Sequence, residues 1–249
     1  MPAIGASGMS GMSGMSVNIR QQLTARIQYT WITMRGWSKR RGNMLKVWGR
    51  ITSVNVQKVM WTVSELGLPH ERIDAGLHFG GVNEDWYRTM NPNGRVPVIS
   101  DDGFVLWESN AIVRYLAAAY GADTLYPPAP RVRADADRWM DWATSTMNPV
   151  MTPLFWGLIR TPPDKRDAAA LDKLRLQMED VMQILDTQLA ARPYIAGDTL
   201  TIGDIPAGCF AQRWLALPMA HGEHSHLMRW IERLSVREGF IKHVRMELA

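Results

Sequence analysis

Residues 91–110 read NPNGRVPVISDDGFVLWESN and carry the strongest structural signal in the chain. Two short β-prone runs, 96–100 and 104–107, flank Asp101-Asp102-Gly103, and an Asp-Gly pair between such runs is a strong hairpin signal. Pro97 lies inside the first run, which predicts an edge strand or an unusual local geometry. Apolar residues then recur at helical spacing. The stretch therefore predicts a β-hairpin that leads into a helix.

A strand, a helix and a second strand are predicted before this hairpin. Residues 45–48 alternate like a short strand, and apolar residues then recur at helical spacing up to a Gly-Leu-Pro break at 67–69. Residues 70–74 are typical of a second strand. Because crossovers of this kind are right-handed, the two strands are expected to be parallel neighbours. A weakly helical stretch follows at 84–89.

Only helical patterns remain downstream of the hairpin. A helix is predicted from Ser109, with a buried face made of Ile112, Tyr115, Leu116 and Ala119. After a proline-rich linker at 125–130, apolar residues mark one long helix through 136–154 and another through 171–189. The sequence therefore predicts an α/β half followed by an all-α half.

Residues 200–205, LTIGDI, match a capping box with a hydrophobic staple. Thr201 is expected to accept a hydrogen bond from the amide of Asp204, whose carboxylate would accept one from the amide of Thr201. Such a cap contributes on the order of 1 kcal/mol to a helix start. Its predicted role is in folding and not in catalysis.

The net charge of +4 does not predict a nucleic-acid-binding surface. Residues 1–43 hold six of the 28 basic residues and no acidic residue, so the remaining 22 basic residues face 24 acidic ones. A body with this slight acidic excess lacks the basic stripe that phosphate binding requires. No apolar run reaches the ~18–20 residues of a membrane span.

Residues 1–43 are predicted to be a disordered leader or upstream extension. They contain the repeat GMSGMSGMS and have no stable apolar period. Their Arg- and Ser-rich composition superficially resembles a transit peptide, but an upstream extension is the preferred interpretation because Met44 directly precedes the first strand.

Cysteine and histidine usage gives little support for a disulfide or a metal site. Cys209 is the single cysteine, which excludes an intrachain disulfide and favours a reducing compartment, the cytoplasm. We interpret Cys209 as a buried packing residue. His221, His224 and His226 lie close together in a Gly-containing connection, a spacing that does not match a metal-binding motif, so no metal is predicted.

Motifs in both halves resemble the glutathione S-transferase family. The segments that carry this resemblance are 91–97, 107–109, 201–204 and 229–233. Those that look like the bacterial theta-like branch, of the GstB type, are 48–50, 55–59 and 157–163. The resemblance implies a thioredoxin-like, glutathione-binding domain of βαβ-ββα order at 44–121 and a C-terminal helical bundle domain at 131–249.

The resemblance places a glutathione clamp on the hairpin segment. Ser109 stands where a strand becomes a helix, so its hydroxyl and the free helix-start amides suit the γ-glutamyl carboxylate, and Glu108 suits the α-ammonium group. The resemblance also makes the Val96-Pro97 bond cis, with the Val96 backbone facing the cysteinyl backbone of glutathione. Arg95 belongs to the same segment. The alternatives are a simple helix cap at Ser109 and an edge-strand Pro97.

The group that activates the thiol is expected just after the first strand, where the positive end of a helix dipole favours an anion. Ser53 falls where theta- and zeta-like enzymes carry their catalytic serine, and a hydroxyl that donates to sulfur lowers the pKa of the thiol. Disulfide-reducing nu-type relatives have Thr and Asn two apart in this loop, which matches Ser53 and Asn55. Asn55 is therefore the alternative, unless it only caps the helix.

The resemblance implies an enzyme that directs the thiolate of glutathione at a small electrophile, by substitution, including dehalogenation, or by addition. The alternatives are a glutathione-dependent disulfide reductase of nu-like type and a non-catalytic transferase-like binding module. The electrophile is expected against the helix end at 154–160, where Arg160 would face an anionic substrate or leaving group unless it is an ordinary helix-end arginine. Detoxification and a homodimer are also implied, with no nucleic acid, membrane or metal as partner.

Overall fold

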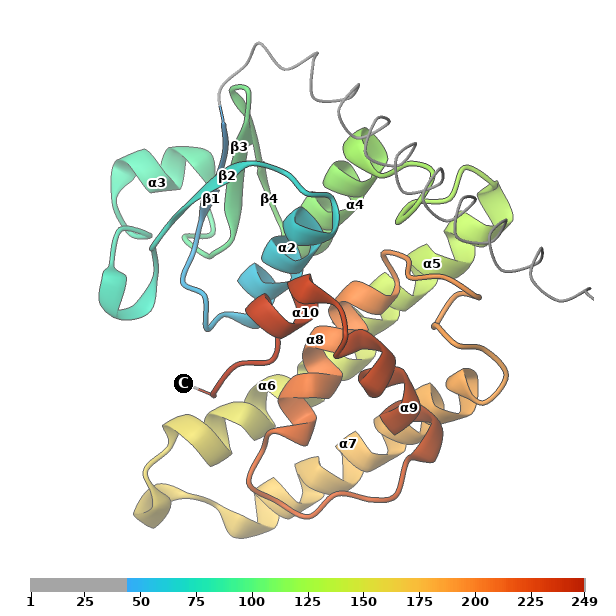
Figure 1. Ribbon diagram of the computed structural model, residues 1–249. Helices are drawn as coiled ribbons and strands as arrows, with labels where there is room; N and C mark the ends of the chain where they lie inside the picture. Colours follow the sequence, from blue (N-terminus) through green and yellow to red (C-terminus); the bar gives the residue numbers. More distant parts are fainter. Residues whose placement is uncertain (1–43, 249) are drawn as a thin grey trace, which may run out of the picture. The chain divides into compact units, whose positions relative to one another are not determined.

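The computed structural model describes residues 44–248, so the predicted leader at 1–43 lies outside the described residues. In the described part, a mixed four-stranded sheet with helices on both faces is followed by helices alone (Figure 1). None of the helices described is long and apolar enough to cross a bilayer.

The first unit is a strand, a helix and a parallel strand, as predicted. β1 (Leu45–Trp48) leads into α2 (Val54–Glu65), and β2 (His70–Ile73) pairs with β1 in parallel, with Leu45 opposite His70. The apolar face of α2 that packs on the sheet is fully buried and consists of Val56, Val59, Met60 and Val63.

The hairpin of β3 (Val98–Asp101) and β4 (Phe104–Trp107) follows the short helices η1 (Leu77–Phe79) and α3 (Asp85–Met90). The sheet order is β2-β1-β3-β4, so β3 is an inner strand. Of the two alternatives predicted at Pro97 the edge strand is wrong, and the unusual local geometry, a cis bond, is confirmed. Pro97 precedes β3 and forms a cis peptide bond with Val96. Its missing amide is outside the strand ladder, which is why an inner strand tolerates it.

α4 (Ser109–Tyr120) and α2 pack on one face of the sheet, while α3 packs on the other (Figure 1). Ile112 and Leu116 are buried as predicted, and Tyr115 is half-buried. Ala119, however, is exposed. The additional buried positions are Val113 and Ala117, because α4 faces the helical half as well as the sheet.

The predicted long helix is a continuous helical run with two wider turns. α5 (Pro130–Trp142) passes through a π-helical turn at Ala143–Met147 into α6 (Asn148–Phe155), and a second π-helical turn, Trp156–Arg160, ends the run. After a short 3-10 turn, η4 (Pro163–Lys165), the chain returns along α7 (Ala168–Leu189). The remaining helices are α8 (Asp204–Leu215), α9 (Ser225–Leu234) and α10 (Glu238–His243).

The capping box forms only in part. The Thr201 amide donates to Asp204 Oδ2 at 2.9 Å as predicted, but the Thr201 hydroxyl donates to the same carboxylate at 3.2 Å and does not accept from the Asp204 amide. The amide of Ile195 and the indole of Trp230 both donate to Oδ1 at 3.0 Å. The carboxylate of Asp204 is fully buried and joins three segments of the helical half, because tertiary contacts recruit it beyond its local role.

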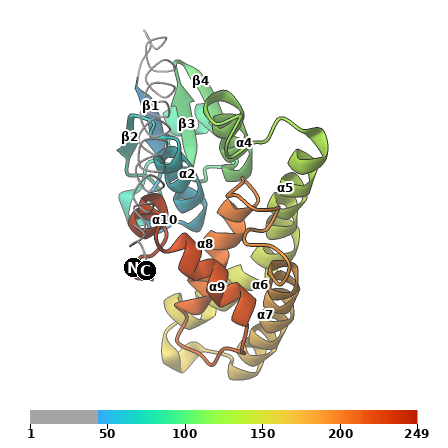
Figure 2. The same cartoon turned by 45° about the vertical axis from the view of Figure 1, so that its right-hand side comes forward.

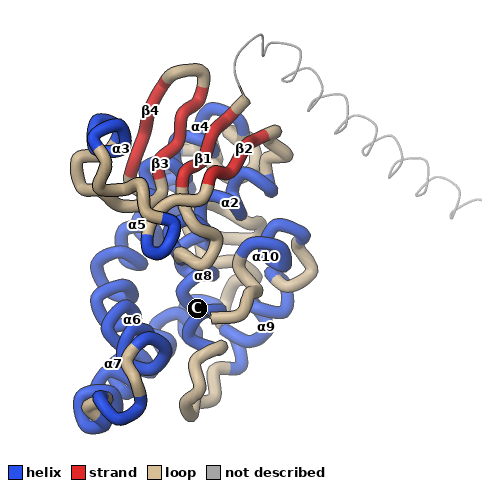
Figure 3. Tube along the Cα trace, turned by 90° about the vertical axis from the view of Figure 1, so that its left-hand side faces the viewer, coloured by secondary structure: helices blue, strands red, loops and turns tan. Residues whose placement is uncertain are grey.

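One of the three hydrophobic clusters formed by the described residues extends from the helical half into the α/β half, where it includes Trp61, Val113 and Ala117. Trp61 of α2 contacts Phe240 of α10 edge to face, with 5.0 Å between ring centroids, and α8 approaches α2 through Gly208. A Cβ at Gly208 would lie 2.9 Å from the Trp61 ring, so the close approach requires glycine. Glu65 accepts from the Trp61 indole and from the guanidinium of Arg237. These contacts hold α10 and α8 against α2 (Figures 2 and 3).

Candidate active site

The loop that follows β1 is fixed by backbone hydrogen bonds. Gly49 donates to the carbonyl of Ile73 at 2.8 Å, and Arg50 donates to that of Ala75 at 3.1 Å. The loop ends at Ser53, which is the N-cap residue of α2, is only 7% exposed and makes no side-chain cap hydrogen bond within the described chain. A buried hydroxyl at a helix start that is not used as a cap is available as a donor to a ligand.

Asn55 links this loop to the turn before α4. Its Oδ1 accepts from the Ser109 hydroxyl at 3.3 Å, although the two residues are 54 positions apart. The same oxygen accepts from Nζ of Lys58 at 3.0 Å. The prediction that Asn55 is only a helix cap is wrong, since Ser53 is the N-cap and the Asn55 side chain bonds to two other side chains.

The segment before β3 is held by its own side chains. The carbonyl of Arg95 accepts from the Tyr87 hydroxyl at 2.9 Å and from Nδ2 of Asn91 at 2.8 Å. Gly94 has φ +59°, and a Cβ there would lie 2.8 Å from the carbonyl oxygen of Val82, so this turn needs glycine. Within the described residues, the Val96 amide and carbonyl form no backbone hydrogen bond, so an extended ligand can pair with them.

The turn from β4 into α4 has an unusual backbone. Glu108 adopts φ +71°, a conformation that non-glycine residues rarely have and that occurs mainly where the surroundings impose it. Ser109, the first residue of α4, is 6% exposed. The start of α4, with the Ser109 hydroxyl, thus lies directly beside the start of α2, with Ser53 and Asn55. This arrangement suits an anionic group.

Four cationic side chains surround this region, and the sequence drew attention only to Arg160. Arg213 of α8 donates to the carbonyl of Thr52 at 2.9 Å, and burial lowers its pKa to about 10. The guanidinium groups of Arg213 and Arg160 lie 4.5 Å and 5.3 Å from the centre of the Phe155 ring. Arg50 and Lys58 complete the group. Burial and the nearby Arg160 lower the pKa of Arg50, and burial lowers that of Lys58.

Comparison with known proteins gives the family. Models of the glutathione S-transferase N-terminal and C-terminal domains match residues 43–118 and 147–238. Over 208 residues, 83% of this chain, it is 40% identical to the whole length of glutathione S-transferase GstB of Escherichia coli strain K12. The chain belongs to the glutathione S-transferase family.

A solved structure of a glutathione S-transferase is also similar to this chain. The theta class glutathione S-transferase of the citrus canker pathogen Xanthomonas axonopodis pv. citri, with glutathione bound, is 44% identical, covers 82% of this chain and 99% of its own, and has a TM-score of 0.80. Glutathione S-transferase 3 of Zea mays is 31% identical over 80% of this chain and 93% of its own. The predicted family and the thioredoxin-like and helical fold are confirmed.

The transferase fold brings most of the predicted site residues together. The helix-start residues Asn55 and Ser109 are in contact, and Val96 lies beside Gly49 at the start of the loop. The side chain of Arg95 is exposed, whereas its backbone carbonyl accepts the hydrogen bonds that hold this segment in place. Sequence reasoning missed Lys58 and Arg213. The three-residue spacing of Asn55 and Lys58 on one helix was a usable signal, whereas nothing local points to Arg213.

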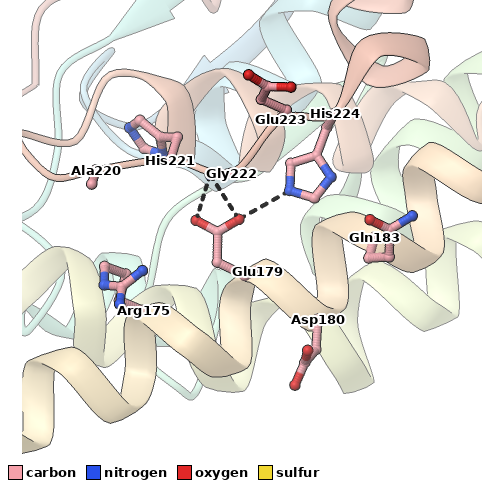
Figure 4. A pocket seen from close by; sticks show the side chains of 9 residues that line it. All are labelled: Arg175, Glu179, Asp180, Gln183, Ala220, His221, Gly222, Glu223 and His224. Carbon is pink, nitrogen blue, oxygen red and sulfur yellow. Dashed lines mark hydrogen bonds and ion pairs between the residues drawn. The ribbon is translucent and has the colours of Figure 1, made fainter.

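A separate cavity of about 460 Å³ lies between α7 and the segment before α9 (Figure 4). Glu179 occupies it and accepts from the Gly222 amide at 3.1 Å and from Nε2 of His224 at 3.0 Å. Trp214 packs edge to face on the His221 ring.

Among residues 44–248, no group of three His, Cys, Asp or Glu side chains is placed to hold a metal ion. Cys209 is fully buried, and burial raises its pKa to about 12, which fits the predicted packing role.

Proposed function

We propose that this glutathione transferase ionises the thiol of glutathione and directs the thiolate at a small electrophile. The observation that carries the proposal is the hydrogen bond between Ser109 and Asn55. It places the helix start suited to the anionic end of the tripeptide beside the loop suited to its sulfur. Ser53 and Asn55 are the proposed donors to the sulfur, which stabilise the thiolate relative to the thiol.

The proposed glutathione clamp consists of Arg95, Val96, Pro97, Glu108 and Ser109. The first amides of α4 bind the γ-glutamyl carboxylate. The Ser109 hydroxyl, whose single hydrogen is donated to Asn55 Oδ1 in the structure, turns to that carboxylate when glutathione binds, and the Glu108 carboxylate binds the neighbouring α-ammonium group. The amide and carbonyl of Val96 pair with the cysteinyl backbone. Tyr87 supports this segment as a donor, because burial raises the pKa of its hydroxyl to about 12 and keeps it protonated.

Ser109→Ala is expected to weaken glutathione binding about tenfold, since a hydrogen bond to a charged group contributes about 1.5 kcal/mol or more. Isothermal titration calorimetry with glutathione measures this. Ser225→Ala is the matched control, because Ser225 also begins a helix, α9, but is exposed. Equal affinities of the Ser109→Ala variant and the wild type would exclude this role for Ser109.

The reaction is balanced without a further reactant. The thiol proton leaves to solvent, the sulfur electron pair forms the carbon–sulfur bond, and in a substitution the carbon–halogen bond breaks with its electron pair on the halide. In an addition the π electron pair of the activated double bond moves to the adjacent carbon and its activating group, which then takes up a proton, so no group leaves. Preorganised donors at the sulfur supply the rate enhancement by lowering the cost of ionisation before the attack.

The cationic side chains around Phe155 favour an anionic electrophile or leaving group. Arg213 and Arg160 both lie over its ring, and Nε of both Arg50 and Arg213 is buried with no hydrogen-bond partner among the described residues. A buried N–H group without a partner is costly, and an anion that accepts from the Nε atoms of Arg50 and Arg213 would remove that cost. A carboxylate-bearing haloalkane is therefore expected to react faster than its methyl ester.

A glutathione-dependent disulfide reductase of nu-like type is the second candidate, because Ser53 and Asn55 at the start of α2 have the spacing of the Thr and Asn of the reductase relatives. In that reaction the thiolate attacks a mixed disulfide, one sulfur–sulfur bond forms and another breaks, and a thiolate leaves. Initial rates with a haloalkane and with a mixed disulfide at equal concentrations separate the two activities. A higher kcat/KM for the disulfide would reverse our order of preference.

A non-catalytic binding module of the same fold is the third candidate. Retention on a glutathione-affinity column together with no turnover over a broad panel of electrophiles would favour it.

We also propose a division into domains at 44–121 and 131–249, a homodimer, a cytoplasmic location and a role in detoxification. Size-exclusion chromatography with light scattering tests the homodimer.

A further inference from the structure

Lys58 is a buried cation beside the proposed thiol-activating group. It lies one turn into α2, is 3% exposed, and its Nζ is 3.0 Å from Oδ1 of Asn55 and 4.6 Å from the centre of the Phe210 ring. Placing a lysine here costs stability, because the charged ammonium group loses its hydration. Met or Leu would fill the same space without that cost, so packing alone does not explain a lysine.

The ammonium group determines which way the Asn55 amide points. An ammonium group has three donors and no acceptor, so the Asn55 atom that it contacts is the oxygen. The Ser109 hydroxyl donates to the same oxygen at 3.3 Å. Lys58 keeps Oδ1 occupied even when the Ser109 hydrogen turns to glutathione. Nδ2 is left as the free donor of the amide, and within residues 44–248 it forms no hydrogen bond.

We propose that Lys58 is a positioning residue that acts through Asn55: it fixes the amide with Nδ2 toward the sulfur of glutathione and polarises it as a hydrogen-bond donor. Chains of hydrogen bonds polarise one another, so a cation at the carbonyl end strengthens the N–H donor at the other end. The positive charge of Lys58 also stabilises the thiolate through space. This inference rests on the proposed ionisation of glutathione by the same loop.

The surroundings of Lys58 make this effect dependent on pH. The pKa of Lys58 is lowered to about 8, mainly by burial and also by Arg213 of α8. Cys209 of α8 and Glu108 of the turn before α4 oppose the shift. The protonated form is the one that supports the thiolate. As pH rises through about 8 the charge is lost, so kcat/KM, which reports groups of the free enzyme, should fall on the alkaline side.

The test compares Lys58→Met, Lys58→Arg and the control Lys46→Met, whose lysine is exposed on β1. The thiolate absorbance of bound glutathione, titrated with pH, gives the pKa of the thiol. In Lys58→Met this pKa should rise by about one unit, which leaves about tenfold less thiolate near neutral pH. kcat/KM should fall by a similar factor, and its alkaline decline should disappear. Lys58→Arg keeps the cation and should restore the low thiol pKa without the alkaline decline.

Thermal unfolding separates this role from a structural one. Because the folded protein holds Lys58 with a lowered pKa, removing the charge should leave the midpoint of Lys58→Met equal to or above that of the wild type. A wild-type thiol pKa in Lys58→Met, or an unchanged alkaline decline in Lys58→Arg, overturns the inference. A lowered midpoint with an unchanged thiol pKa does so too. If the wild type itself neither binds nor ionises glutathione, the proposed function fails instead.

Discussion

Ser53→Ala and Asn55→Ala are expected to lower kcat by roughly 10²-fold or more, the usual effect of removing one preorganised donor to a developing anion. Binding of glutathione should change little, because Val96 and Ser109 hold the peptide portion by separate contacts. Steady-state kinetics with a haloalkane and calorimetry with glutathione measure the two quantities. The larger loss identifies the principal donor to the sulfur.

Ser100→Ala is the control for this pair, because Ser100 lies in β3 opposite Lys46 and away from the loop that follows Trp48. It should retain the kcat of the wild type. If both site variants also retain the wild-type kcat and thiol pKa, the thiolate is stabilised elsewhere and the assignment of this loop is wrong. A loss of glutathione affinity without a loss of kcat would instead make Ser53 or Asn55 a binding residue only.

Asp204→Ala is expected to lower the free energy of unfolding by roughly 3–5 kcal/mol, the largest stability effect of a single substitution that we expect here. The change removes the acceptor of the Thr201 amide and hydroxyl, the Ile195 amide and the Trp230 indole, all of which are buried. Each buried donor left without a partner costs about 1–3 kcal/mol. Chemical denaturation followed by tryptophan fluorescence measures the difference.

Asp198→Ala provides the comparison, because Asp198 lies in the same segment but is exposed. Its free energy of unfolding should stay within about 0.5 kcal/mol of the wild type. A local capping box alone contributes about 1 kcal/mol. A loss of that size in Asp204→Ala would mean that the contacts with Ile195 and Trp230 add nothing, contrary to our interpretation of this carboxylate.

Local patterns predicted the secondary structure well because local physics controls it. The alternation in 45–48, the Asp-Gly turn between β3 and β4 and the helical spacing in α2 and α7 each specify an element within a few residues. The errors came from the environment of those elements. The inner place of β3 depends on its pairing with the distant strand β1, and the exposure of Ala119 depends on which face of α4 its neighbours cover. A single segment contains no record of either.

The candidate site divides in the same way. The sequence by itself predicted the segments that we propose bind glutathione and the polar helix start with Ser53 and Asn55, because turns and helix starts depend on short stretches of chain. Only the tertiary structure showed that Ser109 and Lys58 both donate to the Asn55 amide oxygen. It also showed that Arg213 of α8 donates to the Thr52 carbonyl in the loop after β1. Hydrogen bonds and charge act over a few ångströms in space, whatever the separation along the chain, so these contacts exist only once the two halves have packed around a common core.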